Sequence, residues 1–293
     1  MSDAYNQLLD ATIWHLEDLK SRGVCNVAVS GETLRALARP RAETIQFTTV
    51  KPQLEKPAAP APAAKQAALI ALPGEIQSAI RNPQSPIEKA AAFAALRERA
   101  LACVKCPHLA SSRKNVVFGV GSIDAQLMFV GEAPGADEDE QGEPFVGKAG
   151  QLLTKIIQAT GLKRADVYIA NILKCRPDTP GQTSGNRKPT PVEMQTCLPW
   201  LQEQIDLVRP EVMVALGATA VEGLLGKGEG ITRLRGRFQT FRGIPVMPTF
   251  HPSYLLHNQA PTEKRKVWED MMQVLEKLGA PISEKQRGFF LKG

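Results

Sequence analysis

Four of the five cysteines form a pattern that would tie distant parts of this chain to one site. Cys103 and Cys106 make a C-V-K-C pair, Cys175 lies in L-K-C-R-P, and Cys197 lies in Q-T-C-L-P-W. The last two belong to segments that read as folded structure, so a site built from all four thiols would constrain a whole domain. Sets of four thiolates hold iron–sulfur clusters or structural zinc, and residue type alone does not separate these two.

Length and composition exclude some classes of protein. The 293 residues suffice for one or two domains whose core is stable without disulfides. The sequence has no apolar stretch of transmembrane length and no leader-like N-terminus, so we expect a cytoplasmic monomer that is not bound to a membrane. In that compartment cysteines are metal ligands more often than disulfides. The net charge of +6 and the pI near 9.1 are compatible with nucleic acid, but they are weak indicators.

Four regions of different character follow one another. Residues 1–45 place apolar side chains at helical spacing and predict a small helical segment, whose partner the sequence does not reveal. Residues 46–84 are rich in proline and alanine, which predicts a disordered linker. Residues 85–280 have a globular composition and predict the main domain, and residues 281–293 form a tail.

Short apolar strands alternate with helical segments in the main domain. This alternation predicts a three-layer α/β/α fold with a central, mainly parallel four-stranded sheet. Sites in such sheets lie at the carboxyl ends of the strands, and polar segments follow three of the four predicted strands there. The predicted strands are 126–131, 167–172, 211–217 and 244–250, and the predicted helices are 150–161, 190–205 and 218–225.

Five motifs occur in order: C-V-K-C-P, G-E-A-P-G-A-D-E-D-E-Q-G-E-P-F-V-G-K-A-G-Q-L-L, Y-I-A-N-I-L-K-C-R-P, N-R-K-P-T-P-V-E-M-Q-T-C and H-P-S-Y-L-L. With them, the chain from about 95 to 278 resembles the family 4 uracil-DNA glycosylases, the iron–sulfur branch of that superfamily, with an N-terminal extension. The resemblance implies a base excision repair enzyme that hydrolyses the N-glycosidic bond of uracil in single- or double-stranded DNA. It also implies a 4Fe–4S cluster on the four cysteines, with zinc as the alternative. The segment between Pro177 and Asn186 is longer than the family pattern.

Asn171 and His251 are expected to be catalytic and, together with Phe145, to bind the base. The Asn171 amide can accept from uracil N3–H and donate to O4, whereas cytosine presents the opposite pattern. His251 can donate to O2 of the departing uracil, where comparable donors are worth about 3 kcal/mol. Phe145 can stack on the flipped base. Each has a structural alternative: a strand-end cap for Asn171, a turn histidine for His251, and a core aromatic for Phe145.

The G-E-A-P-G turn supplies the remaining expected base contacts through Gly131, Glu132 and Ala133. Other glycosylase families place an aspartate in this loop to orient the attacking water. This chain has Ala133 at that position, so Glu132 or main-chain groups are expected to substitute. Glu138 resembles the family residue that crowds the uracil C5 edge and excludes thymine, whereas its neighbour Asp139 is expected to be solvated.

Leu255 and Leu256 follow the H-P-S motif, where related glycosylases insert a wedge into the gap left by the flipped base. At least one of the pair is expected to pack into the core instead. Basic residues near the cysteines could contact phosphates, although most of them individually are ordinary solvated charges. They are Lys105, Arg113, Lys114, Lys174, Arg176, Arg187 and Lys188.

Two alternatives from other classes remain at this stage. A non-catalytic iron–sulfur or zinc nucleic-acid-binding module would keep the cysteines and basic loops but would not need Asn171 and His251 at strand ends. An electron-transfer protein is disfavoured because the ligands are spread over an α/β domain and not grouped in one compact run.

Overall fold

The computed structural model describes residues 85–178, 186–226 and 228–291. The helical segment predicted over residues 1–45 and the linker predicted over 46–84 lie outside this range, as does most of the long segment before Asn186. Within the described ranges, no helix is both long and apolar enough to cross a membrane.

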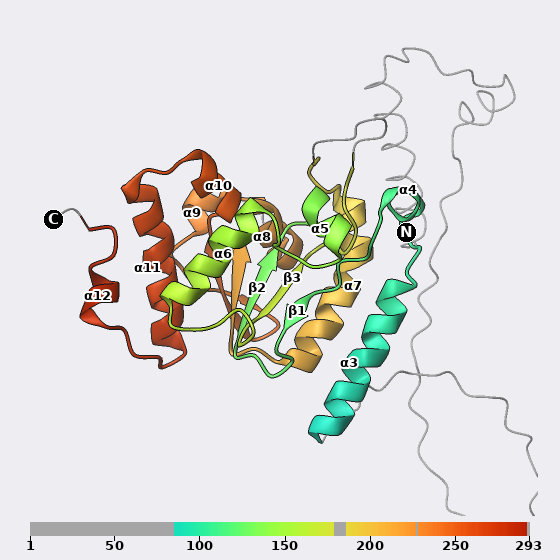
Figure 1. Ribbon diagram of the computed structural model, residues 1–293, viewed down its shortest axis with the longest axis horizontal. Coiled ribbons are helices and arrows are strands. Elements are labelled where there is room, and N and C mark those ends of the chain that lie inside the picture. Colours follow the sequence, from blue (N-terminus) through green and yellow to red (C-terminus); the bar gives the residue numbers. More distant parts are fainter. Residues whose placement is uncertain (1–84, 179–185, 227, 292–293) are drawn as a thin grey trace, which may run out of the picture. The chain divides into compact units, whose positions relative to one another are not determined.

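The described chain forms one central sheet whose four inner strands are parallel (Figure 1). The order across the sheet is β1-β3-β2-β4-β6-β5, and the two edge strands run antiparallel to their neighbours. The predicted mainly parallel sheet is therefore confirmed, but it has six strands where four were predicted. The strands are β1 (Val120–Gly121), β2 (Leu127–Gly131), β3 (Tyr168–Asn171), β4 (Val212–Leu216), β5 (Gln239–Phe241) and β6 (Ile244–Thr249).

The two additional strands were not predicted because neither contains a run of apolar residues. Strand β1 has only two residues, one of them glycine, so it carries no hydrophobic pattern. Strand β5 pairs with β6 through a tight hairpin in which Phe241 lies opposite Ile244. Its two loop residues, Arg242 and Gly243, have φ of 50° and 84°, as the hairpin turn with the twist of the strands requires. A polar edge strand of this kind depends on its turn more than on burial.

Helices cover both faces of the sheet (Figure 1). One face packs against α3, α7 and α8, and the other packs against α6 and α11. Helices α6, α7 and α8 lie where helices were predicted. The helices are α3 (Pro86–Leu101), α4 (Pro107–Ser112), α5 (Ala136–Gln141), α6 (Lys148–Ala159), α7 (Pro191–Val208), α8 (Ala218–Leu225), α9 (Ile231–Leu234), α10 (Pro252–His257), α11 (Pro261–Lys277) and α12 (Glu284–Arg287).

Alternation along each inner strand divides the core into two layers. In β2, Met128 and Val130 join the cluster with α7, whereas Leu127 and Phe129 join the cluster with α6 and α11. All four side chains are at most 2% exposed. Because both faces are covered, these strands are continuously apolar, and polar residues begin where the strands end. The carboxyl edge of the sheet is therefore where chemistry is possible.

Candidate active site and thiol pocket

A cavity of about 470 Å³ opens at the carboxyl ends of the parallel strands. Segments that follow β2, β3, β4 and β6 all contribute to its wall, as expected for a parallel sheet. Of the predicted site residues, the cavity brings together Glu132, Ala133, Glu138, Phe145, Asn171 and His251.

Asn171 ends β3 with its side chain buried, at 2% exposure. Within the described part of the chain, no hydrogen-bond partner is within reach of its Oδ1. Gly131 lies close to both Asn171 and Phe145. A Cβ at this position would come within 2.4 Å of Asn171 Oδ1 and 2.5 Å of Phe145 Cζ, so only glycine fits there. A buried acceptor without a hydrogen-bond partner lowers the stability of the fold. Asn171 Oδ1 can therefore accept a hydrogen bond from a donor that enters the cavity.

Phe145 is held in a strained turn at the cavity wall. Its φ is 55°, a region that non-glycine residues seldom adopt, and its ring lies 5.6 Å from the His251 ring. Arg164 supports the turn by donating to the Pro144 carbonyl at 2.5 Å. Gly150 allows α6 to pass close by, since a Cβ there would meet the Phe145 carbonyl oxygen at 1.8 Å. These contacts fix an aromatic face beside the Asn171 amide.

His251 caps α10 and lines the cavity with its imidazole. Its Nδ1 accepts from the Ser253 N–H at 3.1 Å and lies 2.7 Å from Ser253 Oγ. Burial lowers the pKa of His251 to about 4, although the Glu138 carboxylate opposes the shift. The imidazole is therefore neutral near pH 7, and because Nδ1 is an acceptor, its proton lies on Nε2. The residue can thus donate one hydrogen bond without carrying a charge.

The four predicted cysteines line a second pocket, together with Arg113 and Trp200. Arg113 Nη1 donates to Cys175 Sγ at 3.0 Å, and the Lys174 main-chain N–H donates to Cys197 Sγ at 3.2 Å. Trp200 Nε1 is buried and has no partner among the described residues. Donors aimed at sulfur, with a further donor free, suit a group rich in sulfur acceptors.

The protonation of these thiols depends on what they bind. Burial raises the pKa of Cys197 to about 12 and also raises the pKa of Cys106 and Cys175. Near neutral pH only a bound cation would hold such thiols as thiolates. In the described ranges, no three His, Cys, Asp or Glu side chains are already arranged around a single metal ion.

Comparison with known proteins gives this arrangement a family. The model of the uracil DNA glycosylase superfamily matches residues 118–272. A type-4 uracil-DNA glycosylase of Thermotoga maritima is 48% identical over 177 residues, which cover 59% of this chain and 88% of that protein. The chain belongs to the type-4 uracil-DNA glycosylase family. Type-4 enzymes of Saccharolobus solfataricus and Archaeoglobus fulgidus are 41% and 37% identical, over 62% and 65% of this chain and 84% and 93% of theirs.

The acidic turn of this glycosylase holds the loops of the cavity together. The Glu138 carboxylate accepts from the main-chain N–H groups of Gly135, Val146 and Gly147 at 3.0–3.1 Å. The expectation that Asp139 is solvated was wrong: it is 3% exposed, and its carboxylate accepts from the Lys114 N–H at 3.0 Å. A short side chain in the first turn of α5 can reach back to a neighbouring main chain, a contact that local sequence does not reveal.

The predicted wedge residues occupy different environments. Leu255 is 4% exposed and packs with Phe250 and Val267, so in this conformation it is a core residue. Leu256 is only partly buried. Tyr254 is 38% exposed, stacks on Phe250 at 4.6 Å, and reaches Glu263 Oε2 at 3.2 Å. A wedge role for Leu255 would require that side chain to leave its packing.

Several residues that were predicted to contact phosphate have partners inside the glycosylase. Arg187 lines the cavity at the strand ends and donates to both oxygens of Glu193, at 2.8 and 2.5 Å. His108, just after the cysteine pair, lies 2.6 Å from the same carboxylate. Burial alone would raise the pKa of Glu193, but hydrogen bonds from Arg187, the Thr190 N–H and His108 lower it to about 2. Lys174 is 2% exposed, so it cannot contact phosphate in this conformation.

Part of the cavity wall was not predicted from the sequence. Gly217 follows β4 with φ of 92°, and a Cβ there would lie 3.1 Å from His251 Cβ. Ala218, Thr219, Asn186 and Arg187 also line the cavity. The G-A-T segment directly after an apolar strand was the available signal, because every other parallel strand end in this sheet contributes to the site.

Proposed function

We propose that this protein removes uracil from DNA by hydrolysing the N-glycosidic bond and leaves an abasic site. The observation that carries the proposal is the buried Asn171 Oδ1, which faces a cavity with no partner among the described residues. A base with an N–H at the matching position satisfies this oxygen. The curated relatives named type-4 uracil-DNA glycosylases support the same activity.

Recognition of the base follows from the amide of Asn171. Its Oδ1 accepts from uracil N3–H, and its Nδ2 donates to uracil O4. Cytosine offers an acceptor and a donor in the reverse order, which would leave both buried groups unsatisfied. The Phe145 ring provides a stacking face, and the base reaches it only after the nucleotide has flipped out of the duplex.

Cleavage separates a sugar with oxocarbenium character from a uracil that leaves as an anion. His251 Nε2–H donates to uracil O2 as negative charge develops there, and a neutral donor needs no proton transfer to do so. Water then bonds to C1′ of the sugar, and its proton is released to a nearby acceptor. Glu132 lies at the cavity wall in the segment where that water must sit, so we assign it or adjacent main-chain groups to orient the water.

We further propose that Cys103, Cys106, Cys175 and Cys197 hold a 4Fe–4S cluster, with zinc as the less favoured alternative. Four thiols around one pocket, two N–H···S hydrogen bonds and membership of the family support this assignment. When bound, the group would join α4, α7 and the segment after β3 as a structural clamp. The chain's own contribution is to hold the segment that carries Asn171 against α7.

The expected partner is uracil-containing DNA, single- or double-stranded, and we propose that the protein acts on it as a cytoplasmic monomer. None of the four cysteines in the described residues forms a disulfide, which fits a reducing compartment. A non-catalytic nucleic-acid-binding module would not need a buried amide and a neutral imidazole on the same cavity, and an electron-transfer protein would need neither.

The deciding experiment uses full-length protein purified without oxygen and oligonucleotides that differ only in one base. We expect alkali-sensitive abasic sites from the uracil oligonucleotide and none from those with thymine or cytosine. The matched control is His257→Ala, which removes an exposed histidine from α10, the helix that His251 caps, and should retain activity. If Asn171→Ala cleaves at the wild-type rate, the assignment of the cavity is wrong.

A further inference from the structure

Lys174 is buried between the two sites and belongs to neither of them. It lies three residues after Asn171, directly before Cys175, and is 2% exposed. A lysine is almost never fully buried without partners, because its head group must replace lost hydration with hydrogen bonds. What holds this side chain therefore indicates what it does.

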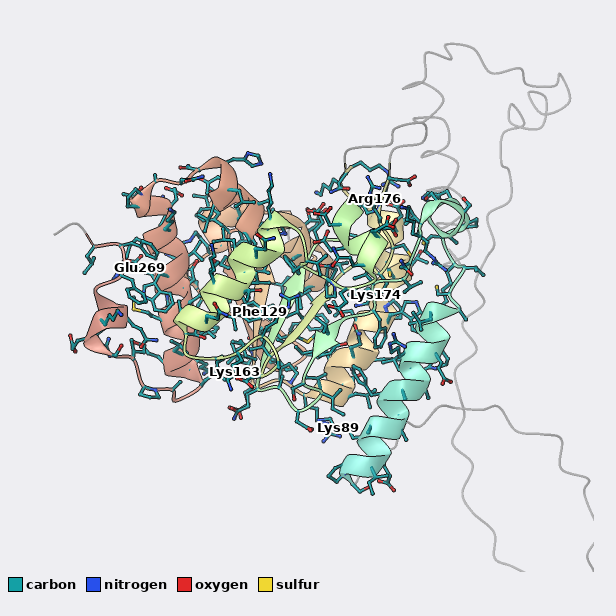
Figure 2. The ribbon with its side chains drawn as sticks, viewed as in Figure 1. Lys89, Phe129, Lys163, Lys174, Arg176 and Glu269 are labelled. Carbon is teal, nitrogen blue, oxygen red and sulfur yellow. The ribbon has the colours of Figure 1, made fainter. Side chains whose placement is uncertain are left out.

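Its head group makes two hydrogen bonds inside the core. Lys174 Nζ donates to the main-chain carbonyl of Asn171 at 3.0 Å and to Gln204 Oε1 of α7 at 2.6 Å. Lys174 is labelled in Figure 2, inside the domain and beside α7. Gln204 is 0% exposed, and its Nε2 donates at 2.9 Å to both the Phe118 carbonyl and the Tyr168 hydroxyl. Both an ammonium and an amine donate from Nζ, so the arrangement does not depend on the charge of Lys174.

The first of these bonds acts on the residue that faces the base cavity. The direction of the Asn171 carbonyl is set by the ψ angle of that residue, so the lysine fixes the backbone from which the amide projects. The hydrogen bonds to the β2 segment involve the residues after Asn171 and not its carbonyl. Ile172 N–H donates to the Gly131 carbonyl at 3.0 Å, and Leu173 N–H donates to the Glu132 carbonyl at 3.1 Å. Lys174 closes the turn that follows.

The same residue is anchored on the side of the thiols. Its main-chain N–H donates to Cys197 Sγ at 3.2 Å, and its carbonyl accepts from the Val117 N–H at 2.7 Å. One residue thus connects the thiol pocket, α7 and the end of β3. A displacement of the segment at Cys175 would therefore move Lys174 and, through its hydrogen bond, the Asn171 backbone.

We propose that Lys174 is a positioning residue for uracil recognition, which holds the Asn171 amide in register with the base through the Asn171 carbonyl and Gln204. The proposal rests on the function proposed above, since it concerns how that cavity reads its substrate. It goes beyond that function because it assigns specificity to a side chain that does not line the cavity.

The test replaces Lys174 with methionine, which has a similar length and no donor. Single-turnover excision, normalised to cluster-bearing protein by iron content and visible absorbance, should fall by about 100-fold, because a small misplacement of a binding group has that effect. Inhibition by free uracil should weaken by about tenfold, as for the loss of one buried hydrogen bond. Binding to uracil-free DNA of the same length should stay within about twofold.

The matched control is Tyr168→Phe, which removes a buried hydroxyl from the same network without touching either bond of Lys174. It should keep the wild-type rate and uracil inhibition even if the melting temperature falls. Gln204→Met releases Nζ from α7 while keeping the lysine, and it should change rate and uracil inhibition in the same direction as Lys174→Met. If Lys174→Met does not fold, Gln204→Met still tests whether Lys174 positions Asn171.

The outcomes separate this proposal from the one on which it rests. Wild-type protein that releases no uracil would refute the proposed function itself. Active wild-type protein together with a Lys174→Met or Gln204→Met variant of unchanged rate and uracil inhibition would overturn the role of Lys174. A variant that loses iron and melting temperature, yet keeps its rate per cluster-bearing molecule, would also overturn it by showing a purely structural lysine.

Discussion

The neutral state of His251 leads to a prediction about pH. The imidazole is partly buried, its Nδ1 accepts from the Ser253 N–H, and burial lowers its pKa from 6.5 to about 4. At pH 6 a histidine of ordinary pKa would be about three-quarters protonated, whereas His251 would be about 1% protonated. We therefore expect the single-turnover rate of uracil excision to show no histidine inflection between pH 8 and pH 5.5.

The same shift has a consequence for stability, and its sign follows from proton binding. Between pH 6.5 and pH 4 the unfolded chain protonates this histidine and the folded chain does not, so stability is complete above pH 6.5 and is lost as pH falls. From the two pKa values, His251 should account for about 2 kcal/mol of stability lost between pH 7 and pH 5. For a domain of this size, a loss of that much unfolding free energy lowers the melting temperature by roughly 4–8 °C.

The assay compares the melting temperature of wild type, His251→Gln and His257→Gln at pH 7 and pH 5 under anaerobic conditions. His251→Gln should lose several degrees less than wild type over this interval, and His257→Gln should behave as wild type. NMR titration of the His251 ring, assigned with the two variants, gives its pKa directly. A titration midpoint near 6.5, or the same pH-dependent loss in all three proteins, would refute the reasoning.

Four further outcomes are expected. Cys197→Ala should abolish the broad visible absorbance of the purified protein, and stoichiometric zinc in colourless wild-type preparations would contradict the iron assignment. Asn171→Asp should slow uracil excision, because the carboxylate lacks the donor for O4, and cytosine oligonucleotides show whether discrimination is relaxed. Phe145→Ala should cost about 1–3 kcal/mol in kcat/KM through lost stacking. Leu255→Ala should lower unfolding stability by about 2–5 kcal/mol and slow duplex and single-strand substrates equally, whereas a selective loss on duplex would support the wedge.

The strands and the position of the site could be predicted because their signals are local. A strand that is covered on both faces must be continuously apolar, so β2, β3, β4 and β6 stand out from their surroundings, and the next polar residues mark the site. Asn171 and His251 were found in this way. Gly217 was not, since a small residue has no chemistry of its own: its position after β4 was the one signal, and the fold brings it against His251.

Burial of charged and apolar side chains outside the strands could not be predicted, because it depends on what packs from elsewhere. Leu255 and Leu256 are neighbours with the same chemistry, yet α11 and the end of β6 cover the first far more than the second. Asp139 and Lys174 belong to charged motifs, and their partners are main-chain groups and α7. Neither the spacing nor the composition of these motifs contains that information.

These buried partners also change which charges can meet DNA. Arg113 donates to Cys175 and to the Cys103 carbonyl, and Arg187 donates to a carboxylate that is 4% exposed. A phosphate would have to replace these partly buried hydrogen bonds to bind either arginine. Lys114 and Lys188 also have carboxylate partners, but their side chains are 63% and 58% exposed. Exposed pairs of this kind are worth about 0–1 kcal/mol, which a phosphate contact can readily exceed. Of these four residues, we therefore expect Lys114 and Lys188, and not Arg113 and Arg187, to contact the DNA backbone.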